Sequence, residues 1–113
     1  MRIGRIDGSG GPGPCKINAF TITYNDPAGH PAVQLYEAPR TSSAVRFPGR
    51  AVTIRPGLTG TITSSSQMVI LWWIQDGRYC SLQTGGLTAG VRLTKVPTAR
   101  LFQIAASLRS TGQ

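Results

Sequence analysis

The sequence predicts an α+β domain, in which a mostly antiparallel, twisted sheet of about five to seven short strands carries one C-terminal helix on one face. Three observations lead to this fold class. The chain of 113 residues contains 14 Gly and 8 Pro, which is typical of many turns and short strands. Its apolar stretches are short, and several alternate apolar with polar residues, as half-buried strands do. Only the last stretch has apolar residues at helical spacing.

A chain of this length forms one domain with one modest core. Residues 1–14, MRIGRIDGSGGPGP, are expected to form a flexible arm or linker, and residues 15–113 the α+β domain. The segment 8–14 holds four Gly and two Pro and offers no side chain suited to a core.

The domain is expected to begin with a hairpin. Residues 17–24 alternate apolar and polar side chains, and residues 32–36 can form the returning strand. Between them, residues 25–29 have the composition of a turn, although the loop is too long for a two-residue hairpin. Residues 40–49 are polar and are expected to form a loop or a short helical turn. Strands at 51–55 and 60–63 follow, separated by a tight turn at Pro56-Gly57.

The most hydrophobic stretch, residues 68–83 (MVILWWIQDGRYCSLQ), predicts a second hairpin and contains both Trp residues. Asp76-Gly77 suits its turn, because a type I′ turn needs positive φ at both central residues. Residues 87–93 fit either a loop or a short edge strand.

Residues 97–110 predict the single helix. Leu101, Ile104, Ala105 and Leu108 form one apolar face at helical spacing. Pro97 suits a first turn, and Thr94 or Thr98 could supply a cap. A helix of this length is marginal alone, so it should dock on the sheet through that face.

The charge balance is strongly basic. Twelve Lys and Arg face four acids, which gives a net charge of +8. A basic surface favours anionic partners, although an excess of charge also serves solubility alone. Neither a basic run nor the aromatic–basic interleaving of RNA-binding proteins is present. The residues that come closest to clustering are Arg40, Arg46, Arg50 and Arg55.

The sequence offers little for catalysis, and we expect neither enzymatic activity, a cofactor nor a metal site. Asp26 and Asp76 occupy turn positions that favour Asp for backbone reasons, and the single His30 lies in a loop. Two cysteines are too few for a zinc site. Cys15 and Cys80 are either disulfide partners or buried free thiols, and a disulfide would argue for an oxidising compartment.

The adjacent Trp72 and Trp73 give the clearest indication of a binding surface. Neighbouring residues of a strand point to opposite faces of the sheet, so only one of the two can join a given core. The other must be covered by a second layer, by neighbouring strand residues or by a partner. With Arg78 and Tyr79 close in sequence, we take Trp72, Trp73, Arg78 and Tyr79 as candidate binding residues.

Three segments carry a family resemblance: VTIRPGLTGT at 52–61, ILWWIQDGRYCSL at 70–82 and LFQIAASL at 101–108. Together they resemble an extracytoplasmic bacterial domain of unknown function, which is found at the C-terminus of anti-sigma-factor-like and lipoprotein-carrier-like membrane-anchored proteins. The matching positions are the Tyr24-Asn25-Asp26 strand end, Trp73, Gly77, Tyr79, Ala105, Ser107 and Leu108.

This resemblance covers residues 17–109 and implies a sensing or binding module outside the cytoplasm, without catalytic residues or a defined ligand. The chain departs from the family at residues 98–100, Thr-Ala-Arg, where acidic residues usually open the last helix, and in its basic charge. No apolar stretch approaches the roughly 18 residues of a membrane span, so any membrane association would need an anchor preceding Met1.

The leading hypothesis is therefore a non-enzymatic extracytoplasmic binding or sensor module that acts through an aromatic sheet surface on a protein or an anionic ligand. One alternative is a basic, nucleic-acid-binding small β domain. Another is a structural or assembly subunit, for example of a phage-like particle.

Overall fold

The fold is described from a computed structural model, which covers residues 2–10, 17–40, 46–88 and 90–108. It confirms the α+β class, with one helix and predominantly antiparallel strands. In chain order the elements are β1 (Arg2–Gly10), β2 (Ile17–Asn25), β3 (Pro31–Pro39), β4 (Arg50–Arg55), β5 (Leu58–Ser64), β6 (Met68–Gln75), β7 (Arg78–Gly85), β8 (Leu87–Thr88), β9 (Val91–Arg92) and α1 (Thr98–Ser107).

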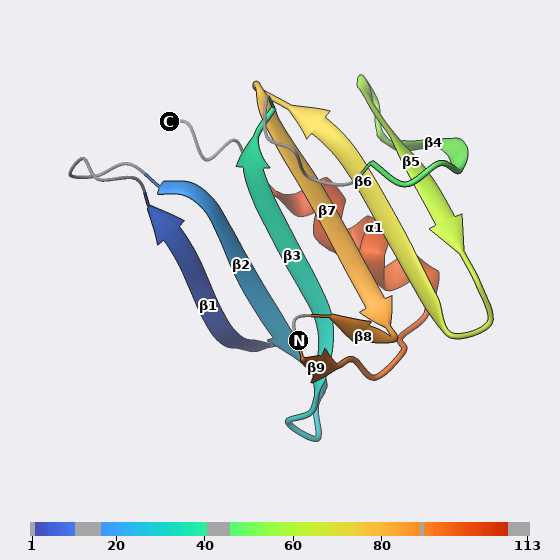
Figure 1. Cartoon of the computed structure of the whole chain (residues 1–113). Coiled ribbons are helices and arrows are strands. Elements are labelled where there is room, and N and C mark those ends of the chain that lie inside the picture. Colours follow the sequence, from blue (N-terminus) through green and yellow to red (C-terminus); the bar gives the residue numbers. More distant parts are fainter. Residues whose placement is uncertain (1, 11–16, 41–45, 89, 109–113) are drawn as a thin grey trace.

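Seven of the strands form one antiparallel sheet in the order β1-β2-β3-β7-β6-β5-β4. It consists of two meanders, β1–β3 and β4–β7, which are joined where β3 pairs with β7. The short strands β8 and β9 pair only with each other, beside the end of β7 (Figure 1). Helix α1 lies on one face of the large sheet, where it contacts β4 and β7 (Figure 1).

The core lies between α1 and the sheet. In antiparallel strands, directly paired residues share a face, so the register places Leu35, Leu82 and Leu71 in one row across β3, β7 and β6. These three side chains are almost fully buried and belong to the same apolar cluster as Leu101 of α1. Other members of this cluster are Ala32, Val33, Ile54, Ile62, Val69, Trp73, Cys80 and Ala105.

The β6–β7 turn has the predicted geometry. Asp76 and Gly77 have φ values of 51° and 75°, and Gln75 pairs directly with Arg78. Positive φ at both central residues is the requirement of a type I′ turn, which matches the natural twist of the two strands. The local sequence therefore fixes the register of the hairpin that carries both Trp residues.

Helix α1 is shorter than predicted and begins without the predicted cap. Pro97 is its N-cap residue, and no side chain makes a capping hydrogen bond, so the expectation for Thr94 or Thr98 was wrong. The predicted apolar face is present, since Leu101 and Ala105 are buried. At the other end, the Arg55 guanidinium donates to the carbonyl oxygens of Ala106 and Leu108, at 3.0 and 3.4 Å. A cation there satisfies terminal carbonyls and interacts favourably with the helix dipole.

Thr84 forms hydrogen bonds with the segment that leads into α1. Its buried hydroxyl accepts a hydrogen bond from the Val96 backbone N–H at 2.9 Å. The same oxygen lies 2.9 Å from the Ala32 carbonyl and 3.2 Å from the Thr94 carbonyl, so its proton has an acceptor in either direction. This side chain links β3, β7 and the start of the helix.

The N-terminal segment differs from the sequence prediction. We expected residues 1–14 to be a flexible arm, whereas Arg2–Gly10 forms β1 at the edge of the sheet, paired antiparallel with β2. Backbone hydrogen bonds hold an edge strand in place, and they form whether or not the strand has side chains suited to a core. Residues 11–16 lie outside the described part of the chain.

Replacing Leu101 by Ala should lower the free energy of unfolding by ~2–5 kcal/mol, because Leu101 is fully buried between α1 and the sheet. Leu87→Ala is the matched control, since Leu87 is 62% exposed and the same truncation there should change stability by less than about 0.5 kcal/mol. Urea unfolding of both variants measures the difference. Equal effects would contradict the placement of the helix.

Candidate functional site

The two Trp residues lie on opposite faces of the sheet, as predicted. Trp73 pairs with Cys80 on the face covered by α1 and is only 1% exposed. Trp72 pairs with Ser81 and Thr61 on the other face, which we call the open face, and it is half-buried. Trp73 is therefore the core residue. Trp72 lies on the face without the helix, so other groups must contact its ring.

Trp72 belongs to an aromatic cluster on the open face, formed by Tyr36, Trp72 and Tyr79 from three adjacent strands. The Trp72 and Tyr79 rings stack with centroids 5.8 Å apart, and Tyr36 meets Tyr79 edge-on at 6.2 Å. The small Ser81 is paired with both Tyr36 and Trp72, which leaves room for the rings above β7. Tyr79, in the middle of the aromatic cluster, is buried, whereas Tyr36 and Trp72 are each half-buried.

The segment before β4 completes the surroundings of the aromatic cluster. The Trp72 indole N–H donates to the Phe47 carbonyl oxygen at 2.7 Å. Next to it, the guanidinium carbon of Arg46 lies 5.5 Å from the Tyr79 ring centroid, which is cation–π geometry. Arg46 also donates to the Arg40 carbonyl oxygen at 2.5 Å while its side chain stays on the surface. A fixed positive charge therefore stands beside the aromatic rings.

Burial raises the pKa of the Tyr79 phenol above its ordinary value, and this effect outweighs the hydrogen bond with Ser81 and the nearby Arg46 charge, which lower it. The phenol thus stays neutral at physiological pH. The positive charge of Arg46 is not cancelled by a phenolate beneath it.

Uncharged polar side chains and the apolar Ala38, Ile70 and Ile74 surround the aromatic cluster on the open face. None of the described strand residues on β2, β3, β5, β6 or β7 that point to this face is acidic. Gln34 and Thr23, for example, lie within 3.5 Å of each other in adjacent strands. The polar members are Thr21, Thr23, Gln34, Thr61, Thr63, Ser81 and Gln83. The open face therefore combines rings, neutral hydrogen-bonding groups and a guanidinium.

The four predicted binding residues are divided between the two faces. Trp72 and Tyr79 lie on the open face, whereas Trp73 and Arg78 lie on the face covered by α1. The Arg78 Nε donates to Glu37 Oε1 at 3.1 Å, and Glu37 is almost fully buried. Arg78 thus compensates a buried carboxylate, because an unpaired charge there would be strongly unfavourable.

Tyr36 and Arg46 are the site residues that the sequence did not indicate. Tyr36 joins the aromatic cluster because β3 pairs with β7, and no local pattern shows that pairing. Arg46 reaches Tyr79 through the connection between the two meanders, 33 positions earlier in the chain than its partner. The sequence shows a loose group of Arg residues at 40–55, but it does not show that one of them contacts the aromatic rings.

Cys80 is a free, buried thiol on the face covered by α1. Burial, followed by the Glu37 carboxylate, raises its pKa to about 12, which makes it a poor nucleophile. Of the two alternatives for Cys15 and Cys80, the disulfide finds no support, and Cys15 itself lies outside the described residues.

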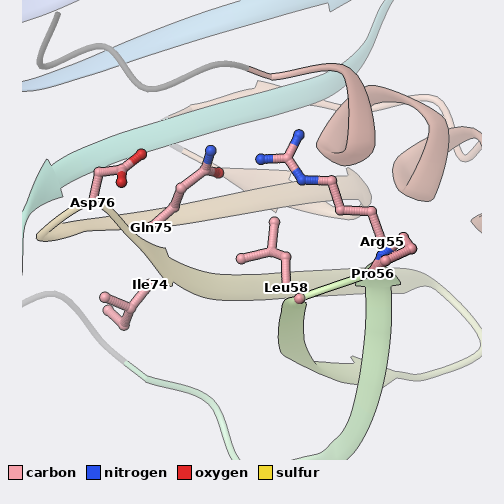
Figure 2. Close-up of a pocket in the computed structure, with 7 residues that line it drawn as sticks. Arg55, Pro56, Leu58, Ile74, Gln75 and Asp76 are labelled. Atoms are coloured by element: carbon pink, nitrogen blue, oxygen red, sulfur yellow. The ribbon is translucent and has the colours of Figure 1, made fainter.

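A shallow hollow of about 330 Å³ lies between the β4–β5 and β6–β7 turns, lined by Arg55, Pro56, Gly57, Leu58, Ile74, Gln75 and Asp76. In Figure 2 the Arg55 guanidinium lies beside the helix. Arg55 holds the α1 carbonyls, and the Gln75 amide oxygen accepts the Trp73 indole N–H at 3.0 Å. Arg55 and Gln75 thus serve the fold, and the open face remains the better candidate site.

In the described part of the chain, no group of three His, Cys, Asp or Glu side chains is close enough to hold a metal ion. Within the same residues, the helix is too short and too polar to cross a membrane.

Comparison with known proteins gives no relative: no family model, curated protein or solved structure matches the chain. The resemblance to the extracytoplasmic bacterial domain therefore stays a prediction. The candidate site has to be interpreted from its own geometry.

The raised pKa of Cys80 predicts a loss of stability at high pH. From pH 9.0, its ordinary pKa, to about 12, the unfolded chain releases the thiol proton while the folded protein keeps it, so the free energy of unfolding falls as pH rises. In a Cys15→Ser background, adding Cys80→Ala should make this fall less steep. Parallel curves from urea unfolding at increasing pH would contradict the prediction.

Proposed function

We propose that this protein is a non-enzymatic binding module that takes its ligand on the open face, at the aromatic cluster and Arg46. The observation that carries the proposal is the combination of two partly accessible rings, Tyr36 and Trp72, with a guanidinium 5.5 Å from the ring between them. Such rings supply contact area at a small loss of conformational freedom, which is why aromatic residues and Arg are enriched at binding surfaces.

The remainder of the molecule is consistent with a scaffold for such a surface. The helix-covered face already has a dense core, in which Trp73 and Leu101 are buried. On the open face, the hydrogen bond from Trp72 to Phe47 holds the indole in one orientation. A ring that is fixed before binding loses little freedom when a ligand arrives.

An extracytoplasmic location is also part of the proposal, and it rests on the family resemblance alone. A free and buried Cys80 supplies no argument for an oxidising compartment. The disulfide therefore no longer supports that location.

A second candidate function, nucleic-acid binding, is favoured by the charge pattern. The chain carries a net charge of +8, and Arg46 lies on a face to which β2, β3, β5, β6 and β7 contribute no acidic residue among those described. An anionic ligand would meet no repulsion from those strands.

A chemical-shift titration tests the proposal, because the two indole N–H signals act as reporters on the two faces. Three anionic probes are added separately at low salt, where charge contacts are strongest: an oligothymidylate, a heparin oligosaccharide and a polyglutamate peptide. We expect at least one of them to shift the Trp72 indole signal and the β3, β6 and β7 amides, while the buried Trp73 indole signal stays in place.

Assignment of the two indole signals comes from Trp72→Phe and Trp73→Phe variants. The proposal is wrong if none of the three probes moves the Trp72 signal. It is equally wrong if the shifts concentrate on α1 and the Trp73 side of the sheet.

A further inference from the structure

We infer that the ligand of the open face is a single-stranded nucleic acid, whose bases stack on Trp72 and Tyr36 and whose phosphates contact Arg46. This inference rests on the proposed binding function and adds the class of ligand. Two features of the open face carry it: the positions of the rings and the charges that surround them.

The rings are placed so that each can take a separate base. Tyr36 on β3 and Trp72 on β6 flank Ser81 of β7, so two strand spacings, ~10 Å, separate their backbone positions. Both side chains are half-buried, whereas Tyr79 between them is buried and its ring stacks against that of Trp72. Sheet surfaces that bind single strands use aromatic side chains in this way, with successive bases stacked on successive rings.

The charges select a polyanion. Arg46 is on the surface, and its guanidinium is held over Tyr79 by the ring and by the Arg40 carbonyl. The carboxylate of Glu37, on the neighbouring β3 position, points to the other face and is engaged by Arg78. A phosphate beside the rings would therefore meet a guanidinium and no carboxylate from the described residues of β2, β3, β5, β6 or β7.

The same features argue against other ligand classes. A neutral glycan would stack on the rings, but it carries no negative charge to pair with the Arg46 guanidinium. An acidic peptide would use Arg46 but carries no regular series of rings. Of these three classes, a nucleic acid alone offers a regular series of rings together with charge. It must be single-stranded, because paired bases present just their edges and a broad sheet face does not enter a groove.

Fluorescence anisotropy at low salt tests the inference with two labelled oligomers of about a dozen nucleotides, an oligothymidylate and an abasic strand of the same length. The abasic strand has the same phosphates without bases. The oligothymidylate should bind on the order of tenfold more tightly, the usual scale for stacking. Trp72→Leu should bring its affinity down toward that of the abasic strand, and Tyr36→Leu on a different strand should do so independently.

Charge is tested by a matched pair of Arg substitutions. Arg46→Ala should weaken binding of both oligomers severalfold, whereas Arg100→Ala, which removes the same charge from the exposed surface of α1, should weaken both much less. Far-ultraviolet circular dichroism and urea unfolding establish that each variant is folded before binding is compared.

Two results would overturn the inference while leaving the binding function in place. One is equal affinity for the oligothymidylate and the abasic strand, unaffected by Trp72→Leu and Tyr36→Leu. The other is a Trp72 indole signal that responds to the heparin oligosaccharide or the polyglutamate peptide but not to the oligothymidylate. If none of the probes moves that signal, the proposed function fails together with the inference.

Discussion

The packing of α1 against the central strands is the interaction on which the rest of the structure depends. Leu101 from the helix and Leu35, Leu71 and Leu82 from three neighbouring strands are each at most 2% exposed. Because strand side chains alternate between faces, the choice of these residues for the core sends every second residue of β6 and β7 to the opposite face. The large Trp72 ring is among them, and α1 cannot cover it.

The open face accommodates Trp72 with polar and aromatic partners rather than with a second apolar layer. The indole N–H is satisfied by the Phe47 carbonyl, and one side of the ring is covered by Tyr79. Arg46 then covers Tyr79. Phe47 and Arg46 come from the segment before β4, and Tyr36 comes from β3, so the complete site exists only once both meanders have joined at β3 and β7. The candidate site is thus a product of the tertiary structure.

The sequence predicted those features that depend on local rules. Alternation separated Trp72 from Trp73, and Asp76-Gly77 gave the turn between β6 and β7. Helical spacing found Leu101 and Ala105 as buried positions of α1. The same alternation rule, had it been applied to Arg78, would have placed this residue on the opposite face from Tyr79.

Features that depend on distant pairing were not predicted. β1 was missed because backbone hydrogen bonds to β2 hold an edge strand without a core side chain of its own. Tyr36 and Arg46 were missed as site residues because neither the β3–β7 pairing nor the path of the chain before β4 leaves a local pattern. The hydrogen bond from Arg55 to the helix carbonyls was missed for the same reason, because it joins residues far apart in the sequence. Conversely, the expected cap at Thr94 or Thr98 followed a local preference, whereas the N-cap position is occupied by Pro97, and no side chain caps the helix.

Collisional quenching by acrylamide of two single-Trp proteins tests the central claim most directly, namely that the face opposite α1 holds an accessible ring that a ligand covers. Trp73→Phe leaves Trp72 as the only fluorophore, and Trp72→Phe leaves Trp73. The account predicts that Trp72 is quenched and becomes protected when oligothymidylate is added, while Trp73 is hardly quenched in either state. Equal quenching of the two, or the absence of protection of Trp72 at saturating oligothymidylate, would contradict it.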